Sequence, residues 1–207
     1  MARPLLHHPD TILDAARDLV AKGGRKAATV TAIARASRAP SGSLYHRFGS
    51  QDRILLEAWL RAVRRFQDGF LAALTGRPPK EAAVAAALWT PRFAGEHPAD
   101  AALLLQYRRE DLLRGPITDL DLIDEVEGIN EPVEKDLRRL AGLLYGGVGR
   151  AGYEALLLAV VDVPYGAVRR HLGRGKPLPG ALPAQVEAAV RAALDAGPER
   201  PRRRGPG

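Results

Sequence analysis

Residues 29–48 read TVTAIARASRAPSGSLYHRF, and this stretch decides the fold of the first part of the chain. Thr29 or Thr31 can cap a short helix whose apolar side chains recur at helical spacing. Residues 37–39 then form a break, and a second short helix follows Pro40. Two short helices joined by a tight turn are typical of a helix-turn-helix unit.

The second short helix has small residues at its start and polar rings and a cation at its end. At ~100° per residue, Leu44 and Phe48 lie together and point toward the preceding helices, while Gly42 and His46 point the opposite way. In a helix-turn-helix unit the second helix enters the DNA major groove with its first residues against base edges. The bare start would allow close approach to the bases, and the polar end can donate to phosphate oxygens. A Tyr-His-Arg triplet is also common on an ordinary solvated surface.

The positive charge of the chain is concentrated near this unit. The net charge is +7 and the sequence pI is about 10.1, yet residues 22–50 hold six Lys or Arg and no Asp or Glu. Residues 199–207 hold four Arg and one Glu, and in the region between, the charges nearly cancel. A basic segment attracts nucleic acid or an anionic membrane surface, with a plain solvated face as the alternative. Together with the helix-turn-helix pattern, the acid-free segment favours DNA.

The composition argues against several other classes of protein. No apolar run approaches ~18 residues, so no transmembrane helix is expected, and the first residues lack the apolar stretch of a secretory signal. The absence of cysteine removes disulfides and thiolate metal sites. We expect a cytoplasmic protein that is not an enzyme and has no cofactor, metal site or membrane partner, because the sequence shows no nucleophile–base pair, glycine-rich phosphate loop or metal-ligand cluster. The segment PSGSL (40–44) is not a nucleophile elbow, since it follows no strand.

Helical spacing continues through the rest of the chain, so the predicted fold is all-α. One helix ends at Gly23-Gly24, and a long one runs from Asp52 to a break at 76–79. The run EALLLAVVDV (154–163) could be a buried strand, but we predict a helix there because no partner strand is present, and Pro164 should kink or interrupt it. After a loop at 173–183 a last helix follows. The remaining helices are predicted at about 81–94, 99–113, 132–145 and 184–196.

The segment TVTAIARASRAPSGSLYHRFGSQDRILLEAWL (29–60) resembles the N-terminal domain of the TetR/AcrR family of bacterial transcriptional regulators. The family pattern has a Thr or Ser at the start of the first short helix, an Ile-Ala pair, a turn, a Gly-small-Leu-Tyr core and an aromatic residue four positions after the Leu. An acidic residue and leucines then open the next helix. The close match covers about residues 9–60. The residues that carry it are Thr29, Ile33, Ala34, Gly42, Ser43, Leu44, Tyr45, Phe48, Asp52, Leu55 and Leu56.

Two positions depart from the family pattern. Arg38 stands where the turn between the two helices usually carries Gly, so Arg38 must take a different backbone conformation or bear some strain. Gln51 stands where a Lys commonly contacts phosphate, and Arg38 or Arg47 would then supply the missing contact. The candidate DNA-contacting residues are Thr29, Thr31, Arg38, Ser41, Gly42, Ser43, Tyr45, His46, Arg47 and Gln51.

The resemblance implies a homodimer that places two copies of helix 41–48 about one DNA turn apart on a near-palindromic operator. The last two helices of the family usually form the dimer interface, for which 149–172 and 184–196 are the candidates here. Their apolar faces could instead pack on the chain's own core. The implied regions are an N-terminal three-helix helix-turn-helix DNA-binding domain at 6–66, a larger helical effector-binding and dimerisation domain at 67–197, and a disordered basic tail at 198–207.

The resemblance also implies a small-molecule effector pocket within the C-terminal helices. Of the eleven aromatic residues in the chain, nine lie beyond residue 51. Apolar pockets lined by aromatic rings are usual ligand sites, although each ring taken singly is more often plain core. The candidate pocket residues are Trp89, Phe93 and Tyr107.

Residues 119–136 form an acidic segment with eight Asp or Glu and one Lys. Its spacing is not that of a calcium loop. We expect a solvated acidic face, or one that faces an Arg-rich helix of the same or a partner chain.

The sequence thus favours a transcriptional regulator, a repressor that an unknown small-molecule effector releases from its operator. The alternative is an effector-independent DNA-binding protein, whose C-terminal domain would be tightly filled.

Overall fold

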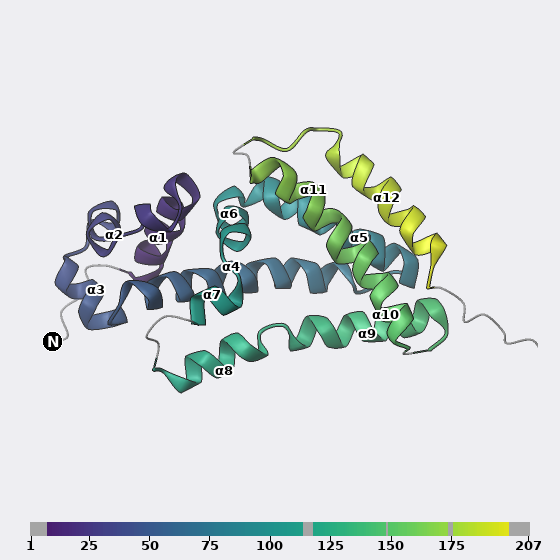
Figure 1. Ribbon diagram of the computed structural model, residues 1–207, viewed down its shortest axis with the longest axis horizontal. Coiled ribbons are helices and arrows are strands. Elements are labelled where there is room, and N and C mark those ends of the chain that lie inside the picture. The colour runs from purple at the N-terminus through teal and green to yellow at the C-terminus, as the bar shows by residue number, and fades with distance from the viewer. Residues whose placement is uncertain (1–7, 114–117, 148, 174–175, 199–207) are drawn as a thin grey trace, which may run out of the picture. The chain divides into compact units, whose positions relative to one another are not determined.

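The computed structural model describes residues 8–113, 118–147, 149–173 and 176–198 (Figure 1). Every regular element in these residues is a helix, which confirms the all-α prediction. The predicted basic tail at 198–207 lies almost wholly outside the described residues. The helices are α1 (Pro9–Gly23), α2 (Val30–Ser37), α3 (Ser41–Phe48), α4 (Gln51–Ala73), α5 (Pro79–Glu96), α6 (Pro98–Gln106), α7 (Arg109–Leu113), α8 (Leu120–Gly128), α9 (Glu131–Tyr145), α10 (Arg150–Leu157), α11 (Val163–Leu172) and α12 (Leu182–Ala196).

The contacts within the chain divide it into two compact units. The first unit comprises residues up to Gln67 together with Phe93–Ile129, and the second comprises Asp68–Arg92 and the residues from Asn130 onward. The boundary at Gln67 lies next to the predicted limit at 66, and the helices α6 to α8 pack with the N-terminal residues. The domain limits 6–66 and 67–197 remain a prediction about function.

The core of the first unit is built from the apolar faces of α1 to α4. Buried side chains of α1, α2 and α3, including Val20, Ile33 and Leu44, meet the buried leucines at the start of α4. Helix α1 ends where Gly24 takes a positive φ of 69°, which a glycine adopts without steric cost. The apolar spacing therefore directs three short helices onto the first turns of α4.

The single helix predicted at 99–113 is wrong, because the chain breaks at Tyr107. Helix α6 ends at Gln106, and Tyr107 is extended, with φ −123° and ψ 131°. The break lets the Tyr107 ring enter the core, where 5% of the residue stays exposed, while the Gln106 side-chain amide donates to the Val20 carbonyl at 3.2 Å. Tertiary packing against α1 thus overrides a helical spacing that continues on both sides.

The ambiguous run at 154–163 is helical, as predicted. A π-helical turn, Leu158–Asp162, joins α10 to α11, so that a helix continues from Arg150 to Leu172 (Figure 1). Proline lacks an N–H, and an α-helical turn leading into Pro164 would leave a carbonyl of the preceding turn unpaired. In the π-helical turn the Val163 N–H donates to the Leu158 carbonyl instead. The wider turn therefore accommodates Pro164 without ending the helix.

This long helix is also the one helix in the described ranges that could cross a membrane by length and composition. Buried helices in soluble proteins pass the same test, so these two properties are weak evidence for a membrane span. Only 33% of its most apolar window is buried within the chain. Three large apolar residues of this helix, Leu158, Val161 and Tyr165, are exposed.

The second unit packs α12 along α10 and α11, and α9 against α10 (Figure 1). Four residues of α12, including Val186 and Val190, are buried. Gly69 of α4 and Trp89 of α5 are in close contact, because a Cβ atom at Gly69 would lie 2.1 Å from the Trp89 ring. Any larger residue at position 69 would displace this indole.

Candidate nucleic-acid interface

Helix α2 is capped by a side chain at its N-terminal end and by a backbone turn at its C-terminal end. Of the two caps expected, Thr29 and Thr31, the N-cap is Thr29, whose hydroxyl oxygen accepts a hydrogen bond from the Ala32 N–H at 3.2 Å. At the C-terminal end Arg38 takes the left-handed conformation, with φ 55° and ψ 26°. The Ala39 N–H donates to the Ala34 carbonyl at 3.0 Å, which closes the turn that leads into α3. Of the two outcomes expected for Arg38, the structure shows the strained one.

Helix α3 presents nearly all of its length to solvent. Leu44 and Phe48 are its two buried residues and lie in the core with α1 and α2, as their helical spacing predicts. The candidate residues Ser41, Gly42, Ser43, Tyr45, His46 and Arg47 are all exposed. Tyr45 is 56% exposed, which is unusual for an aromatic residue on a helix so close to the core. The exposed face thus has the small-to-polar gradient that the sequence predicts.

The other candidate residues lie at the edges of this face. Thr31 and Arg38 are exposed, and Thr29 is exposed while it caps α2. Gln51 is the first residue of α4 and is half-buried. The structure therefore brings the candidates together along α2, the turn and α3, and their contact with DNA remains a prediction.

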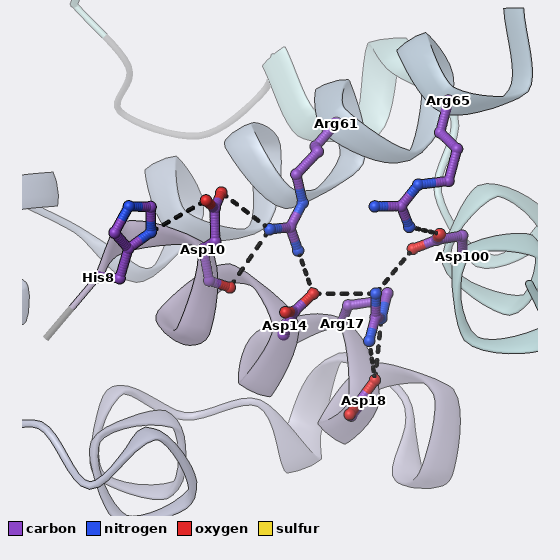
Figure 2. A network of polar contacts seen from close by, with 8 residues as sticks. All are labelled: His8, Asp10, Asp14, Arg17, Asp18, Arg61, Arg65 and Asp100. Atoms are coloured by element: carbon purple, nitrogen blue, oxygen red, sulfur yellow. Dashed lines mark hydrogen bonds and ion pairs between the residues drawn. The ribbon is translucent and has the colours of Figure 1, made fainter. Parts of the chain in front are cut away.

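An ion-pair network joins α1 to α4 and α6 (Figure 2). The Arg61 guanidinium of α4 lies 2.6 Å from the Asp14 carboxylate, which lies 3.0 Å from the Arg17 guanidinium of α1. Arg17 also lies 2.8 Å from Asp18 on its own helix. Burial alone would lower the pKa of Arg17, but the surrounding carboxylates, led by Asp18, outweigh burial and raise this pKa above its ordinary value.

Asp100, at the start of α6, is the inner end of the network. Asp100 is 3% exposed, and no other charged residue in the described ranges is buried. One Asp100 carboxylate oxygen lies 3.4 Å from Arg17, and the other pairs with Arg65 of α4 (Figure 2). A buried carboxylate needs such partners, because desolvation without compensation is costly. Sequence reasoning missed Asp100, since nothing in the sequence around His97-Pro98 indicates that its partners come from α1 and α4.

The acidic segment faces basic residues of α4 in the same chain. Asp119 caps α8 by accepting from the Leu122 N–H at 3.2 Å, and it also lies 3.0 Å from Arg53. Glu125 of α8 pairs with Arg64. The described contacts therefore favour the expectation of an acidic face opposite an Arg-rich helix. No group of three or more His, Cys, Asp or Glu in the described ranges has the geometry to hold a metal ion.

The three aromatic residues predicted for an effector pocket are placed differently. Phe93 is buried and packs edge-on against Phe66, with ring centroids 5.3 Å apart. Trp89 lies over Gly69. The buried Tyr107 hydroxyl has no hydrogen-bond partner, and burial raises the pKa of Tyr107 above its ordinary value. Their role in ligand binding stays a prediction.

Two surface hollows are present in the second unit. One of about 220 Å³ lies between α9 and the α4–α5 turn, lined by Leu74, Arg77, Arg139, Leu140 and others. The second, of about 290 Å³, lies between α11 and α12, with Gly166, Ala167, Val186 and Ala189 in its lining. Neither hollow is lined by Trp89, Phe93 or Tyr107.

The helix-turn-helix matches a known family in sequence. Residues 12–58 match the sequence model of the family described as bacterial regulatory proteins, tetR family. No sequence among the curated proteins matches the chain.

Solved structures are similar over nearly the whole chain. The TetR family transcriptional regulator PfmR from Thermus thermophilus has a TM-score of 0.66 at 23% identity, covering 91% of this chain and 99% of that one. The ketosteroid transcriptional regulator KstR2 of Mycobacterium tuberculosis has a TM-score of 0.68 at 18% identity, covering 96% and 99%. The transcriptional regulator FadR from Bacillus subtilis, in complex with stearoyl-CoA, has a TM-score of 0.67 at 16% identity, covering 90% and 98%. At these identities the likeness is one of fold.

The helix-turn-helix packed on a long fourth helix, followed by an all-helical C-terminal region, is the fold that this chain shares with these solved structures. The sequence match within α1 to α4 assigns residues 12–58 to the TetR family. The resemblance noted from residues 29–60 is thereby confirmed.

Proposed function

We propose that the protein is a cytoplasmic repressor that binds a palindromic operator as a homodimer and is released by a small-molecule effector. The observation that carries the proposal is the exposed face of α3. This face combines small residues at its start with Tyr45, His46 and Arg47 at its end, in a segment without acidic residues. Base edges would meet the small residues, and phosphate oxygens would accept from the polar side chains.

Dimer formation is supported by apolar residues that the chain leaves uncovered. Leu158, Val161 and Tyr165 are 54%, 38% and 40% exposed and fall at helical spacing on the helix from Arg150 to Leu172. Small residues beside them, Gly166 and Ala167, line the hollow between α11 and α12 and would let a partner helix approach closely. A contiguous apolar face of this kind usually marks an interface.

Effector binding is supported by the buried Tyr107 hydroxyl, which lacks a partner and would accept or donate one hydrogen bond to a ligand. The stearoyl-CoA complex of the Bacillus subtilis FadR shows that this fold can hold an acyl-CoA in that protein. Acyl-CoAs are therefore reasonable first ligands to test here. Effector binding would favour a dimer state that misfits the operator and would lower DNA affinity by the difference between the two states.

The test is fluorescence anisotropy with DNA fragments from upstream of the protein's own gene. We expect binding that weakens steeply between about 50 and 200 mM salt, since phosphate contacts release counterions. The double variant Tyr45→Ala/Arg47→Ala should lose this binding, whereas Lys135→Gln on α9 should retain it. Absence of salt-sensitive binding to every such fragment at low salt would refute the proposal.

A second candidate function is effector-independent DNA binding. It predicts a tightly filled C-terminal domain, and the two described hollows both lie below the usual range of about 300–1,000 Å³ for ligand pockets. Release of the operator by a small molecule at micromolar concentration, with the dimer intact, would exclude this alternative.

A further inference from the structure

Arg38 occupies a backbone position that elsewhere in the chain is given to glycine. Helices α1, α3, α9 and α12 each end at a glycine with positive φ, between 61° and 76°. Helix α2 ends at Arg38, which is the single non-glycine residue with positive φ in the described ranges. A side chain with a Cβ atom is disfavoured in this conformation.

The left-handed conformation is imposed by the surrounding turn. The Arg38 N–H donates to the Arg35 carbonyl at 3.3 Å, and the Ala39 N–H donates to the Ala34 carbonyl at 3.0 Å. This pair of hydrogen bonds is the Schellman arrangement, in which the residue at the Arg38 position is usually Gly. Ala34 and Ala39 are both buried, so the turn cannot relax without exposing them. The strain at Arg38 is therefore retained by the fold.

Nothing within the described part of the chain explains an arginine here by folding. The Arg38 side chain is exposed, and no carboxylate in the described ranges pairs with it. Its nearest charged neighbour along the chain is Arg35, and residues 22–50 contain no acid. A glycine would relieve the strain, and the present residue adds only a free guanidinium. Strained residues that persist without a folding role are found disproportionately at functional sites.

We propose that Arg38 is a DNA phosphate contact made from the turn. This inference rests on the proposed DNA-binding function. In a helix-turn-helix unit the first helix crosses the DNA backbone and the second enters the major groove, so the turn between them passes beside the phosphates. A guanidinium suits this place because its planar fork can donate two parallel hydrogen bonds to a phosphate.

The test separates strain from charge with three variants and a control. Arg38→Gly removes both the strain and the charge, Arg38→Gln removes only the charge, and Arg38→Lys keeps both. Lys135→Gln on α9 is the control, since it removes one exposed positive charge outside the first unit. Each protein is measured by thermal unfolding and by anisotropy titration on the wild-type operator fragment at several salt concentrations.

We expect stability and DNA affinity to move in opposite directions. Arg38→Gly should raise the melting temperature by about 2–4 °C and weaken DNA binding about three- to tenfold. Arg38→Gln should weaken binding equally without the rise in melting temperature. In both variants the slope of log affinity against log salt should fall by about 0.9 per protomer. Arg38→Lys should keep the salt slope, and Lys135→Gln should change neither quantity.

Unchanged affinity and salt slope in Arg38→Gln, with a wild-type protein that binds, would overturn this inference and leave the proposed function standing. A loss confined to one operator sequence, with the salt slope unchanged, would overturn the phosphate assignment in favour of a base contact. If the wild-type protein binds no fragment, both the proposed function and this inference fail.

Discussion

Two sets of arginines in the first unit have opposite surroundings. The scaffold set lies on α1 and α4, and its members, including Arg17, Arg61 and Arg65, pair with carboxylates of the same chain (Figure 2). The recognition set consists of Arg35, Arg38 and Arg47, on α2, the turn and α3. Within the described residues these three have no carboxylate partner, and the Arg47 guanidinium lies 5.9 Å from the Phe48 ring centroid.

The difference shows how one residue type serves two purposes within one small unit. Paired arginines contribute little net field, because carboxylates a few ångströms away cancel their charge. The unpaired arginines keep their full charge within reach of solvent and give this face its positive potential. The scaffold set therefore positions the helices, and the recognition set remains available for a polyanion.

The largest effect is expected from removing Asp100, the carboxylate that two arginines of the scaffold set share. Asp100→Asn should destabilise the protein by about 3 kcal/mol, because Arg17 and Arg65 lose a buried carboxylate partner. Urea unfolding measures this loss. The control is Asp18→Asn, which removes a half-exposed partner of the same Arg17 and should cost less than about 1 kcal/mol. Equal losses of unfolding free energy in the two variants would mean that the burial of Asp100 does not make its ion pairs more stabilising than the exposed one.

The recognition set should show the reverse behaviour. Arg35→Gln/Arg47→Gln should weaken operator binding about tenfold, or about 1.4 kcal/mol, because two unpaired cations are removed from the face of α2 and α3. The free energy of unfolding should change by no more than about 0.5 kcal/mol. Anisotropy titration measures the operator affinity, and urea unfolding of the same preparations measures the free energy of unfolding. A clear loss of stability with intact DNA binding would place these arginines in the scaffold set.

A smaller effect is expected at the start of α2, where the Thr29 side chain caps the helix. Thr29→Ala should cost about 1 kcal/mol of stability, since the Ala32 N–H loses its side-chain acceptor. Thr31→Ala, two residues along on the exposed side, should be nearly neutral in the same urea experiment. Similar costs in both variants would show that the cap contributes little.

The smallest effect is expected at Tyr107. Tyr107→Phe should stabilise the protein by about 0.5–1 kcal/mol, because it removes a buried hydroxyl without a partner. Burial raises the pKa of this hydroxyl, so the folded state holds the proton more tightly than the unfolded state. Wild-type stability is then fully present below the ordinary tyrosine pKa of about 10 and falls as the pH rises above it, which widens the gap to Tyr107→Phe. Destabilisation by this variant would indicate a hydrogen bond that the hydroxyl makes in solution.

The candidate DNA-binding face could be predicted to a large extent because its pattern is local. Leu44 and Phe48 are four residues apart, so their spacing alone orients α3 and exposes the residues between them. For Arg38 the family pattern, which usually has Gly at this position, left a different backbone conformation or strain as the two outcomes, and the structure shows the left-handed conformation. The break at Tyr107 could not be predicted, because the helical spacing on both sides of it is intact and the cause is packing against α1.

The sequence by itself determined the order of the first four helices, the exposed face of α3 and the concentration of cations around it, since each depends on residues a few positions apart. Only the tertiary structure decided which arginines are neutralised. Asp100 meets Arg17 and Arg65 across 83 and 35 positions of the sequence. Ion pairs between distant segments depend on how the helices pack, and local spacing carries no information about that packing.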